Sequence, residues 1–264
     1  MKKNYIKSAP EQGNILGIRF NSTSTSEVLN FVKTRLETKE KFYILTINPE
    51  IVLIAKDDWL LKRVIKRCDI SIPDGIGIKF AYKYLHHKDI EVIKGRNLFL
   101  DLIKLADDNH LKVFLLGGWK DEAERAKREL EKVYKNVIIH THVAPSYNHH
   151  CRPISTEDKI IHRKITGSIK LFGPDLVFVG IGAPKQEKWI FRYFFNLGST
   201  GAMTVGGTFN SIAKIHPLPP KWMEDIGLEW LWRLITEPYR VKRIWNATVV
   251  FTWRVFWSKF IKNK

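Results

Sequence analysis

Short, almost wholly apolar runs alternate along the chain with longer segments that carry apolar residues at helical spacing. Four of the runs are Phe42–Ile47 (FYILTI), Lys112–Leu116, Leu176–Val179 and Ala202–Gly207. A strand that is covered on both faces requires such a run. Segments such as Pro49–Arg67 place apolar residues mostly three or four positions apart, as an amphipathic helix does. The pattern predicts an α/β fold with a Rossmann-like, mostly parallel sheet flanked by helices.

The same periodicity predicts the remaining elements between these runs. Further strands or extended stretches are expected at Ile15–Phe20, Asp69–Ile72, Ile90–Ile93 and Val137–Val143. Further helices are expected over Ile76–Leu85, Lys120–Tyr134 and about Ser155–Ile169. One more helix is expected to run through Thr38, with its N-cap among Ser22–Thr25, and another to follow Lys94–Arg96 and run through Asp108. A short helix through Lys214 and an aromatic-rich helical stretch, WMEDIGLEWLWRLI, are expected after the last strand. The polar stretch between the strand Val137–Val143 and the helix that follows it is typical of a surface loop.

The stretch Asp175–Ile190 (DLVFVGIGAPKQEKWI) carries the most informative polar residues. A buried strand ends in a glycine-rich turn, and Pro184 suits the first turn of a helix because it needs no N–H there. Lys185 and Gln186 then lie at a helix N-terminus, at the carboxyl end of a strand. Ligands bind at this edge of open α/β sheets, and a helix N-terminus favours anions. The stretch therefore predicts a binding site for an anionic ligand.

Polar side chains also follow two other predicted strands. Thr46 and Asn48 lie at the end of one strand, and Asp74 lies just beyond another, between a proline and a glycine. Asn48 is equally suited to cap the helix that begins at Pro49, and Asp74 to cap the helix Ile76–Leu85, because Asn and Asp are favoured N-cap residues. Both interpretations stay open from the sequence, since capping does not exclude contact with a ligand.

The glycine pair Gly117–Gly118 follows a further strand and would let a phosphate or ribose approach the backbone. The pair is weaker evidence than the G-x-G-x-x-G fingerprint, and no acidic residue is convincingly placed to hold an adenosine ribose. The sequence therefore argues against a nicotinamide-binding Rossmann domain.

The composition narrows the class of partner. The 264 residues carry a net charge of +17, which indicates nucleic acid, an anionic membrane surface or phosphorylated substrates as partners, or else simply a solvated basic surface. Only two cysteines occur, which favours a reducing, cytoplasmic setting without a disulfide framework. The basic N-terminal stretch is followed by no apolar segment, and no apolar run approaches the ~20 residues that span a bilayer. We expect neither a secretory signal nor a transmembrane helix.

Histidines gather in the middle of the chain without forming a known metal motif. The spacing of His140, His142, His149, His150 and Cys151 matches no structural zinc pattern. Histidines in loops are more often solvated than bound to metal. We therefore expect no metal site and no cofactor.

The segment 237–264 differs in composition from the rest of the chain, with many basic residues against a single acidic one and with Trp and Phe between them. One apolar stripe on a helix is formed by Trp245, Val249, Trp253, Phe256 and Phe260. Such a helix can lie in the interface of an anionic membrane. The alternatives are a helix packed on the domain core and, less favoured, binding of nucleic acid. We expect an α/β domain over 1–236 and a membrane-associating appendage over 237–264, which self-associates where no membrane is present.

A series of motifs occurs in a fixed order along the chain: TINPE at 46–50, PDGIG at 73–77, KGRNLF at 94–99, FLLGG at 114–118, VGIGAPKQEKW at 179–189, VGGTFNSIA at 205–213 and GLEWLWRLITEPYR at 227–240. In this order and spacing they resemble the WecG/TagA/CpsF glycosyltransferase family over about 46–245. The resemblance implies inverting, metal-independent transfer of a hexose or N-acetylhexosamine, with N-acetylmannosamine favoured, from a UDP-sugar to a polyprenyl-diphosphate-linked acceptor. It also implies a peripheral position on the inner face of the bacterial cytoplasmic membrane and a role in teichoic acid or other surface polysaccharide synthesis.

The resemblance also implies roles for single residues. By this resemblance, Asp74 corresponds to the family's candidate general base. Thr46 and Asn48 match its active-site polar pair. Arg240 and Arg243 match the basic appendage that helps to close the site over the diphosphate. A desolvated cleft would make Asp74 a stronger base than a free carboxylate, whose pKa is near 3.9. The other expected substrate-binding residues are Arg96, Gly117, Gly118, Lys185, Gln186, Gly206, Gly207 and Asn210.

Two departures from the family pattern concern the selection of donor or acceptor. Asn210 stands where members commonly carry Asp, and the loop 144–154 differs from the family's usual stretch. The alternatives from other classes are a non-catalytic membrane or nucleic-acid binder with the same fold, and a sugar-nucleotide epimerase or dehydrogenase. The missing dinucleotide fingerprint argues against the second.

Overall fold

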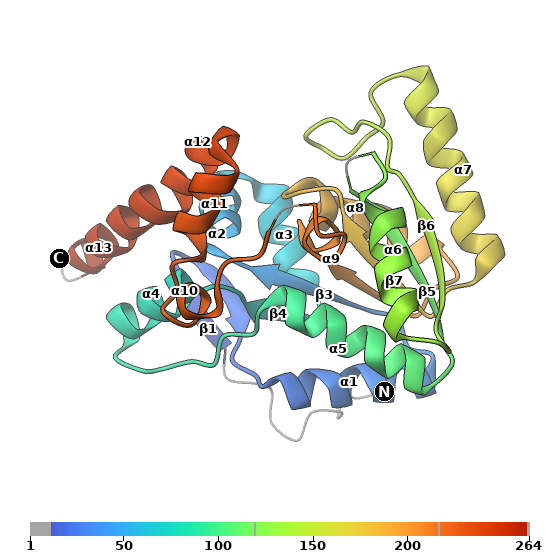
Figure 1. The fold of residues 1–264 in the computed structure, drawn as a ribbon. Helices are drawn as coiled ribbons and strands as arrows, with labels where there is room; N and C mark the ends of the chain where they lie inside the picture. The colour runs from blue at the N-terminus through green and yellow to red at the C-terminus, as the bar shows by residue number, and fades with distance from the viewer. Residues whose placement is uncertain (1–11, 119, 216, 263–264) are drawn as a thin grey trace.

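A six-stranded sheet lies between two layers of helices in the computed structural model, which describes residues 12–118, 120–215 and 217–262 (Figure 1). Each pair of neighbouring strands is parallel, and the strand order is β4-β3-β8-β7-β5-β6. The strands are β3 (Phe42–Ile47), β4 (Ile70–Pro73), β5 (Lys112–Gly117), β6 (Ile138–His142), β7 (Leu176–Gly180) and β8 (Gly201–Thr204). The predicted α/β fold with a parallel sheet is confirmed.

The helices cover the sheet on both faces. One layer comprises α1 (Thr25–Thr38), α5 (Gly95–Asp108), α6 (Glu122–Val133) and α9 (Thr208–Ile212). The other comprises α2 (Pro49–Asp57), α3 (Trp59–Arg67), α4 (Ile76–His86), α7 (Thr156–Phe172) and α8 (Lys185–Tyr193), which is followed by the short helix η1 (Phe194–Asn196).

Alternate side chains of each strand enter two separate hydrophobic cores. In β3, Ile44 packs in the core beneath α1 and α5, whereas Tyr43 and Leu45 pack in the core beneath α2 and α3. Both faces of the strand are therefore buried, which explains why its sequence is almost wholly apolar.

The N-terminal part forms a hairpin instead of the single strand predicted over Ile15–Phe20. β1 (Gln12–Ile15) pairs antiparallel with β2 (Ile18–Asn21), outside the six-stranded sheet. The turn between them places Leu16 and Gly17 at φ values of 52° and 85°. Two successive residues with positive φ are typical of the tight turns that join hairpin strands, and this turn divides the apolar run.

The helix predicted over Pro49–Arg67 is two helices, α2 and α3. Asp58 lies between them with extended backbone geometry, and its side chain accepts a hydrogen bond of 2.9 Å from the backbone N–H of Leu61. Asp58 thus ends one helix and caps the next, so the helical spacing of apolar residues continues across a break that periodicity does not reveal.

Residues 90–93 form no strand, in contrast to the expectation. Ile90 and Ile93 are buried, and the backbone N–H of Ile93 donates to the carbonyl of Pro73 in β4 (3.0 Å). Burial of the two isoleucines explains the apolar pattern, although the segment pairs with β4 too briefly to count as a strand.

After the short helices α10 (Lys221–Asp225) and α11 (Glu229–Thr236), the chain forms a nearly continuous helical rod. Its parts are η2 (Pro238–Arg240), α12 (Val241–Trp245), the π-helical η3 (Asn246–Val250) and α13 (Phe251–Lys262). Phe251 and Val255 are only 2% and 4% exposed, because this face of the rod packs against α2 and α4. The packed-helix interpretation is therefore right for this face.

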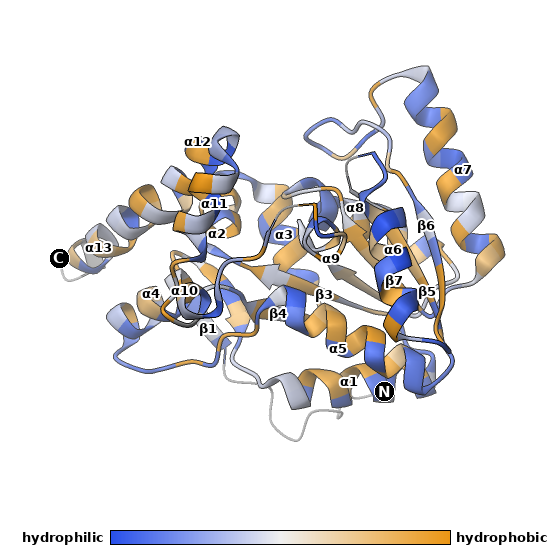
Figure 2. Cartoon of the chain, viewed as in Figure 1, coloured by the Kyte–Doolittle hydropathy of each residue, from blue (hydrophilic) through white to orange (hydrophobic). Residues whose placement is uncertain are grey.

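The opposite face of the rod exposes the apolar stripe predicted from the sequence, including Trp245, Trp253 and Phe260. Apolar residues recur along α12 and α13 at the edge of the molecule (Figure 2). Within the described ranges, no helix combines the length and the apolar character that crossing a membrane demands.

Candidate active site

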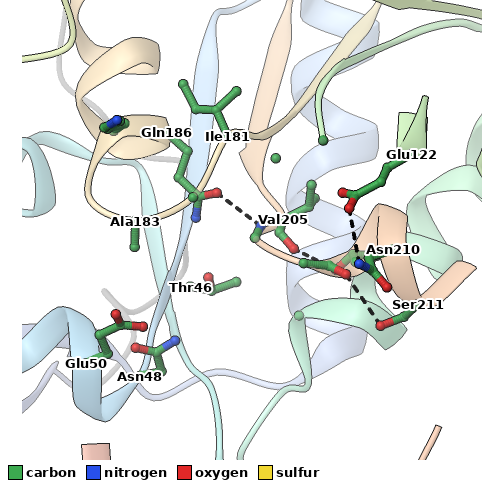
Figure 3. Close-up of a pocket in the computed structure, with 18 of the residues that line it drawn as sticks. Thr46, Asn48, Glu50, Glu122, Ile181, Ala183, Gln186, Val205, Asn210 and Ser211 are labelled. Atoms are coloured by element: carbon green, nitrogen blue, oxygen red, sulfur yellow. Dashed lines mark hydrogen bonds between the residues drawn. The ribbon is translucent and has the colours of Figure 1, made fainter. Parts of the chain in front are cut away.

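A cleft of about 960 Å³ opens where the strands of the sheet end (Figure 3). Residues that end or follow all six strands line it, because the carboxyl ends of parallel strands meet at one edge of the sheet. From the strands come Thr46 and Asn48 (β3), Asp74 (β4), Gly118 (β5), Ala144 (β6), Gly182 (β7) and Gly206 (β8). The C-terminal elements supply a further wall, with Glu224, Glu229, Arg233, Tyr239, Arg240 and Arg243.

The structure brings all but one of the predicted site residues to this cleft. They are Thr46, Asn48, Asp74, Arg96, Gly118, Lys185, Gln186, Gly206, Gly207, Asn210, Arg240 and Arg243. Gly117 lies beneath the lining at φ +115°, where a Cβ atom would stand 2.6 Å from the side chain of Ile181 and 2.8 Å from the backbone of Gly180. The close approach of β5 to β7 therefore requires Gly117, while Gly118 faces the cleft.

Asp74 is a half-buried carboxyl group that does not cap a helix. The N-cap of α4 is Gly75, so the capping interpretation of Asp74 is wrong and its side chain is available to the cleft. Burial raises the pKa of Asp74 to about 6, and the negative charge of Glu229 adds to this effect. A hydrogen bond from the backbone of Gly95 and the charge of Arg233 act in the opposite direction.

Thr46 and Asn48 flank the same part of the cleft. Thr46 packs against the start of α5, where a Cβ on Gly95 would stand 3.0 Å from the Thr46 methyl and 3.4 Å from the Asp74 carboxylate. Asn48 caps α2 by accepting a bond of 2.9 Å from the N–H of Ile51, which confirms the capping interpretation. Asn48 also lines the cleft, so its two expected roles are compatible.

Gln186 and Glu187 form a buried polar pair at the start of α8. The Gln186 amide accepts a bond from the backbone N–H of Gly206 (3.1 Å) and donates one to Glu187 Oε1 (2.8 Å), which joins the turns after β7 and β8 (Figure 3). Glu187 is completely buried, and among the described residues its Oε2 has no hydrogen-bond partner. Burial raises the pKa of Glu187 to about 7.

The loop 144–154 is anchored more firmly than a surface loop of polar sequence suggests. Tyr147 is buried, and its hydroxyl accepts a bond of 3.1 Å from the indole N–H of Trp189. The buried Lys188 donates to the carbonyl of His149 (2.8 Å). These contacts fix the loop as a wall of the cleft, to which it contributes residues 144–147 and 154.

The histidines in and near this loop do not converge on a common point. His149 and His150 contact each other with their rings 4.3 Å apart, while His162 bonds to Tyr147. Across the ranges that the structure describes, no three His, Cys, Asp or Glu side chains are grouped so that they could hold a metal ion.

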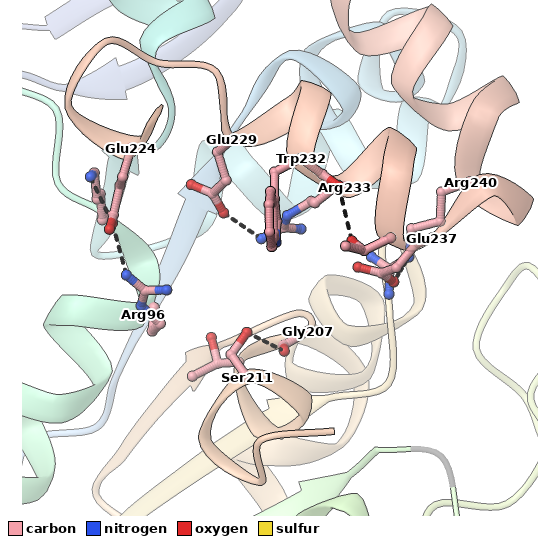
Figure 4. A network of polar contacts seen from close by, with 12 residues as sticks. Arg96, Gly207, Ser211, Glu224, Glu229, Trp232, Arg233, Glu237 and Arg240 are labelled. Carbon is pink, nitrogen blue, oxygen red and sulfur yellow. Dashed lines mark hydrogen bonds and ion pairs between the residues drawn. The ribbon is translucent and has the colours of Figure 1, made fainter. Parts of the chain in front are cut away.

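Carboxylates hold most of the cations that face the cleft (Figure 4). Arg243 binds Glu50 through two bonds of 2.8 Å, although the two residues lie far apart in the sequence. The remaining pairs are Lys94 and Arg96 with Glu224 (2.8 Å each), Arg233 with Glu229 (2.6 Å) and Arg240 with Glu237 (2.5 Å). The cleft thus combines a carboxyl of raised pKa with positioned guanidinium groups that can bind an anion.

Several cleft residues were not predicted from the sequence, namely Glu50, Glu122, Glu224, Glu229, Arg233 and Tyr239. Glu122 is the first residue of α6, and its Oε1 accepts a bond of 3.1 Å from the amide of Asn210. An acidic residue in the first helical turn after the Gly117–Gly118 pair is the signal that would have revealed Glu122. Glu50, Glu224 and Glu229 also lie in the first turns of their helices, but their place in the cleft depends on which distant segments fold together.

Comparison with known proteins gives a consistent result over nearly the whole chain. Residues 13–264 match the family model described as "Glycosyl transferase WecG/TagA/CpsF family". The chain is 31% identical over 247 residues to the N-acetylglucosaminyldiphosphoundecaprenol N-acetyl-beta-D-mannosaminyltransferase of Staphylococcus aureus strain NCTC 8325 / PS 47, and the match covers 93% of this chain and 92% of that relative. The protein of the same name from strain MRSA252 is 30% identical over the same shares.

The buried carboxyl of Glu187 predicts a pH-dependent effect of the substitution Glu187→Gln on stability. A raised pKa means that the folded chain binds more protons than the unfolded chain between about pH 4.5 and pH 7, so the wild type loses stability as pH rises through that window. The amide introduced at this position can still accept the bond from Gln186 and carries no charge. Relative to the wild type, the variant should gain on the order of 3 kcal/mol in unfolding free energy from about pH 5 to about pH 8. Urea unfolding at both pH values measures this gain, and an equal difference at both would contradict it.

Proposed function

The chain belongs to the WecG/TagA/CpsF family and is a glycosyltransferase, and we propose that it transfers N-acetylmannosamine from its UDP-sugar to a GlcNAc-diphosphoundecaprenol acceptor. The name of the two Staphylococcus aureus relatives specifies this sugar, this acceptor and a β linkage. The observation in this chain that carries the proposal is the carboxyl of Asp74, whose pKa is raised to about 6 in a cleft lined by arginines. The product would be the start of a teichoic acid linkage unit.

The proposed reaction is a single displacement at the anomeric carbon of the donor. A hydroxyl oxygen of the acceptor forms a bond to that carbon, while the bond from the carbon to the diphosphate oxygen breaks and its electron pair leaves with UDP. Asp74 takes the proton of the attacking hydroxyl as general base. Attack from the face opposite the leaving group converts an α-linked donor into a β-linked product. A carboxyl with a pKa near 6 is still mostly ionised at neutral pH and is a stronger base than a free aspartate.

Cations around the cleft are suited to the leaving diphosphate. Lys185 is the first residue of α8, where a helix N-terminus also favours negative charge. Arg240 and Arg243 line the same cleft, and their ion pairs with Glu237 and Glu50 hold them there. In a reaction without a metal ion, as the family resemblance implies, these groups carry the charge that develops on UDP.

The proposal includes attachment of the enzyme to the inner face of the cytoplasmic membrane through the appendage. Trp253 and Trp257 are 61% and 45% exposed, and Arg254 and Lys259 lie on the same helix. Aromatic rings at the interface and basic residues near anionic headgroups both favour such binding. The same rod also carries Arg240, which lines the cleft. A bound rod would therefore bring the cleft close to an acceptor whose lipid chain stays in the bilayer.

The substitution Asp74→Asn tests the proposed reaction. We expect UDP release from UDP-N-acetylmannosamine, in the presence of a soluble diphosphate-linked GlcNAc acceptor, to fall by about 10²–10⁴-fold, because the proton acceptor is lost. Affinity for UDP, measured by calorimetry, should stay close to that of the wild type. The matched control is Asp108→Asn, an exposed aspartate at the end of α5, which should keep full activity. Turnover by Asp74→Asn at the wild-type rate would exclude Asp74 as the base.

The double substitution Trp253→Glu, Trp257→Glu tests the proposed membrane contact. We expect co-sedimentation with phosphatidylglycerol vesicles to fall at least about tenfold. The variant lacks the two indole rings that would insert into the membrane interface, and its new carboxylates are repelled by the anionic headgroups. The rate with a vesicle-embedded acceptor should fall too, while the rate with a short-chain soluble acceptor should not.

The control for the membrane test is Leu171→Glu, which changes a 92% exposed residue on α7, at the far side of the molecule from α13 (Figure 1). Leu171→Glu should bind vesicles as the wild type does. Undiminished binding of the double variant would contradict the assignment of this face to the membrane.

A further inference from the structure

We propose that Glu122, held in place by Asn210, binds a pair of adjacent hydroxyl groups on the nucleotide-sugar donor. This inference rests on the proposed function, because it names how the donor is recognised in the same cleft. Two parts of such a donor carry adjacent hydroxyls, the ribose and the transferred sugar. The position of Glu122 in the cleft favours the ribose.

Glu122 and Asn210 come from different helices and meet at the cleft. Glu122 is the first residue of α6, Asn210 lies on α9, and the two helices pack against each other. The amide Nδ2 of Asn210 donates to Oε1 of Glu122 over 3.1 Å. In Figure 3 the two side chains point toward each other, well away from Asn48 and Glu50 at the other end of the view. Both residues line the cleft.

Glu122 differs electrostatically from the other glutamates that line the cleft. Glu50, Glu224 and Glu229 each form an ion pair with an arginine. Glu122, in the part of the chain that the structure describes, has no cation within 4.0 Å and bonds only to a neutral amide. An unpaired carboxylate repels a diphosphate, so it is suited to a part of the ligand that carries hydroxyl groups.

The geometry leaves the carboxylate free to accept hydroxyl hydrogens. A carboxylate has about four acceptor sites on two oxygens, and the bond from Asn210 uses one of them. Gly118 leaves space beside it, because a Cβ at position 118 would stand 3.2 Å from Oε2 of Glu122. An aspartate at position 210 would place two carboxylates within hydrogen-bond distance, so the amide at 210 and the acid at 122 complement each other.

The distance from Asp74 indicates which hydroxyl pair is bound. Asp74 follows β4 and Glu122 follows β5, with β3, β8 and β7 between these strands. Neighbouring strands lie ~4.8 Å apart, so the two strand ends are separated by several times the width of a hexose ring. If Asp74 acts at the anomeric carbon, Glu122 lies beyond the diphosphate, where the ribose follows in a UDP-sugar.

Binding of UDP and 2′-deoxy-UDP to the variant Glu122→Gln tests the inference. We expect calorimetry to show UDP affinity at least about tenfold lower than in the wild type, because the variant loses hydrogen bonds to a charged acceptor. 2′-Deoxy-UDP should bind the wild type more weakly than UDP does and should lose little further affinity on substitution, since the hydroxyl pair is already incomplete. Glu124→Gln, a change on the same helix outside the cleft lining, should bind UDP normally.

The possible results show whether the hydroxyl pair belongs to the ribose or to the transferred sugar. They also distinguish a failure of this inference from a failure of the proposed function. A loss confined to UDP-N-acetylmannosamine, with UDP unaffected, assigns the hydroxyl pair to the transferred sugar and keeps the role of Glu122. Wild-type affinity of Glu122→Gln for both ligands overturns the inference and leaves the proposed function standing. No UDP binding by the wild type would overturn both. If Glu122→Gln melts at a much lower temperature, Asn210→Ala replaces it, and the loss of the bond that positions Glu122 should weaken UDP binding in the same direction.

Discussion

The partial enclosure of the Asp74 carboxyl is the constraint around which the rest of the cleft is arranged. Six parallel strands end at one edge, which places the carboxyl beside groups from β3, α5 and α11. Burial and the charge of Glu229 raise the pKa of this carboxyl, whereas the N–H of Gly95 and the charge of Arg233 lower it. The balance gives a pKa of about 6, which would suit the proposed role of Asp74 as a base at neutral pH.

The wall of the cleft that the C-terminal elements supply belongs to the same part of the chain that exposes the aromatic stripe. α11 brings Glu229 and Arg233 to the cleft, and the rod that follows is fixed to the sheet domain by the buried Phe251 and by the bond between Arg243 and Glu50. A membrane bound to the stripe, as proposed, would therefore act on a segment that lines the cleft. The proposed chemistry and the proposed membrane contact would then share one stretch of helix, whose sequence is both basic and aromatic.

Much of this arrangement could be predicted from the sequence, because the signals are local. Apolar runs predict the strands of the sheet, and polar residues at strand ends point to Thr46, Asn48 and Asp74. Arg96, Arg240 and Arg243 are expected only from the resemblance to the family. The missed features depend on contacts between distant segments or on single residues. Asp58 breaks a helix without breaking its periodicity, and the pairing of Glu50 with Arg243 joins two segments that lie far apart in the sequence. Asn210 is expected from the sequence as a substrate-binding residue, whereas its partner Glu122 becomes evident only where α6 and α9 pack together.

The pH dependence of kcat/KM with a soluble acceptor tests the central claim most directly. If Asp74 is the base, kcat/KM should fall tenfold per pH unit below a midpoint near pH 6, since the base is lost on protonation. Glu187 also titrates in this region, so the profile is measured in Glu187→Gln as well, where the midpoint should be unchanged. A flat profile down to about pH 4.5, near the pKa of a free carboxyl, would contradict the account.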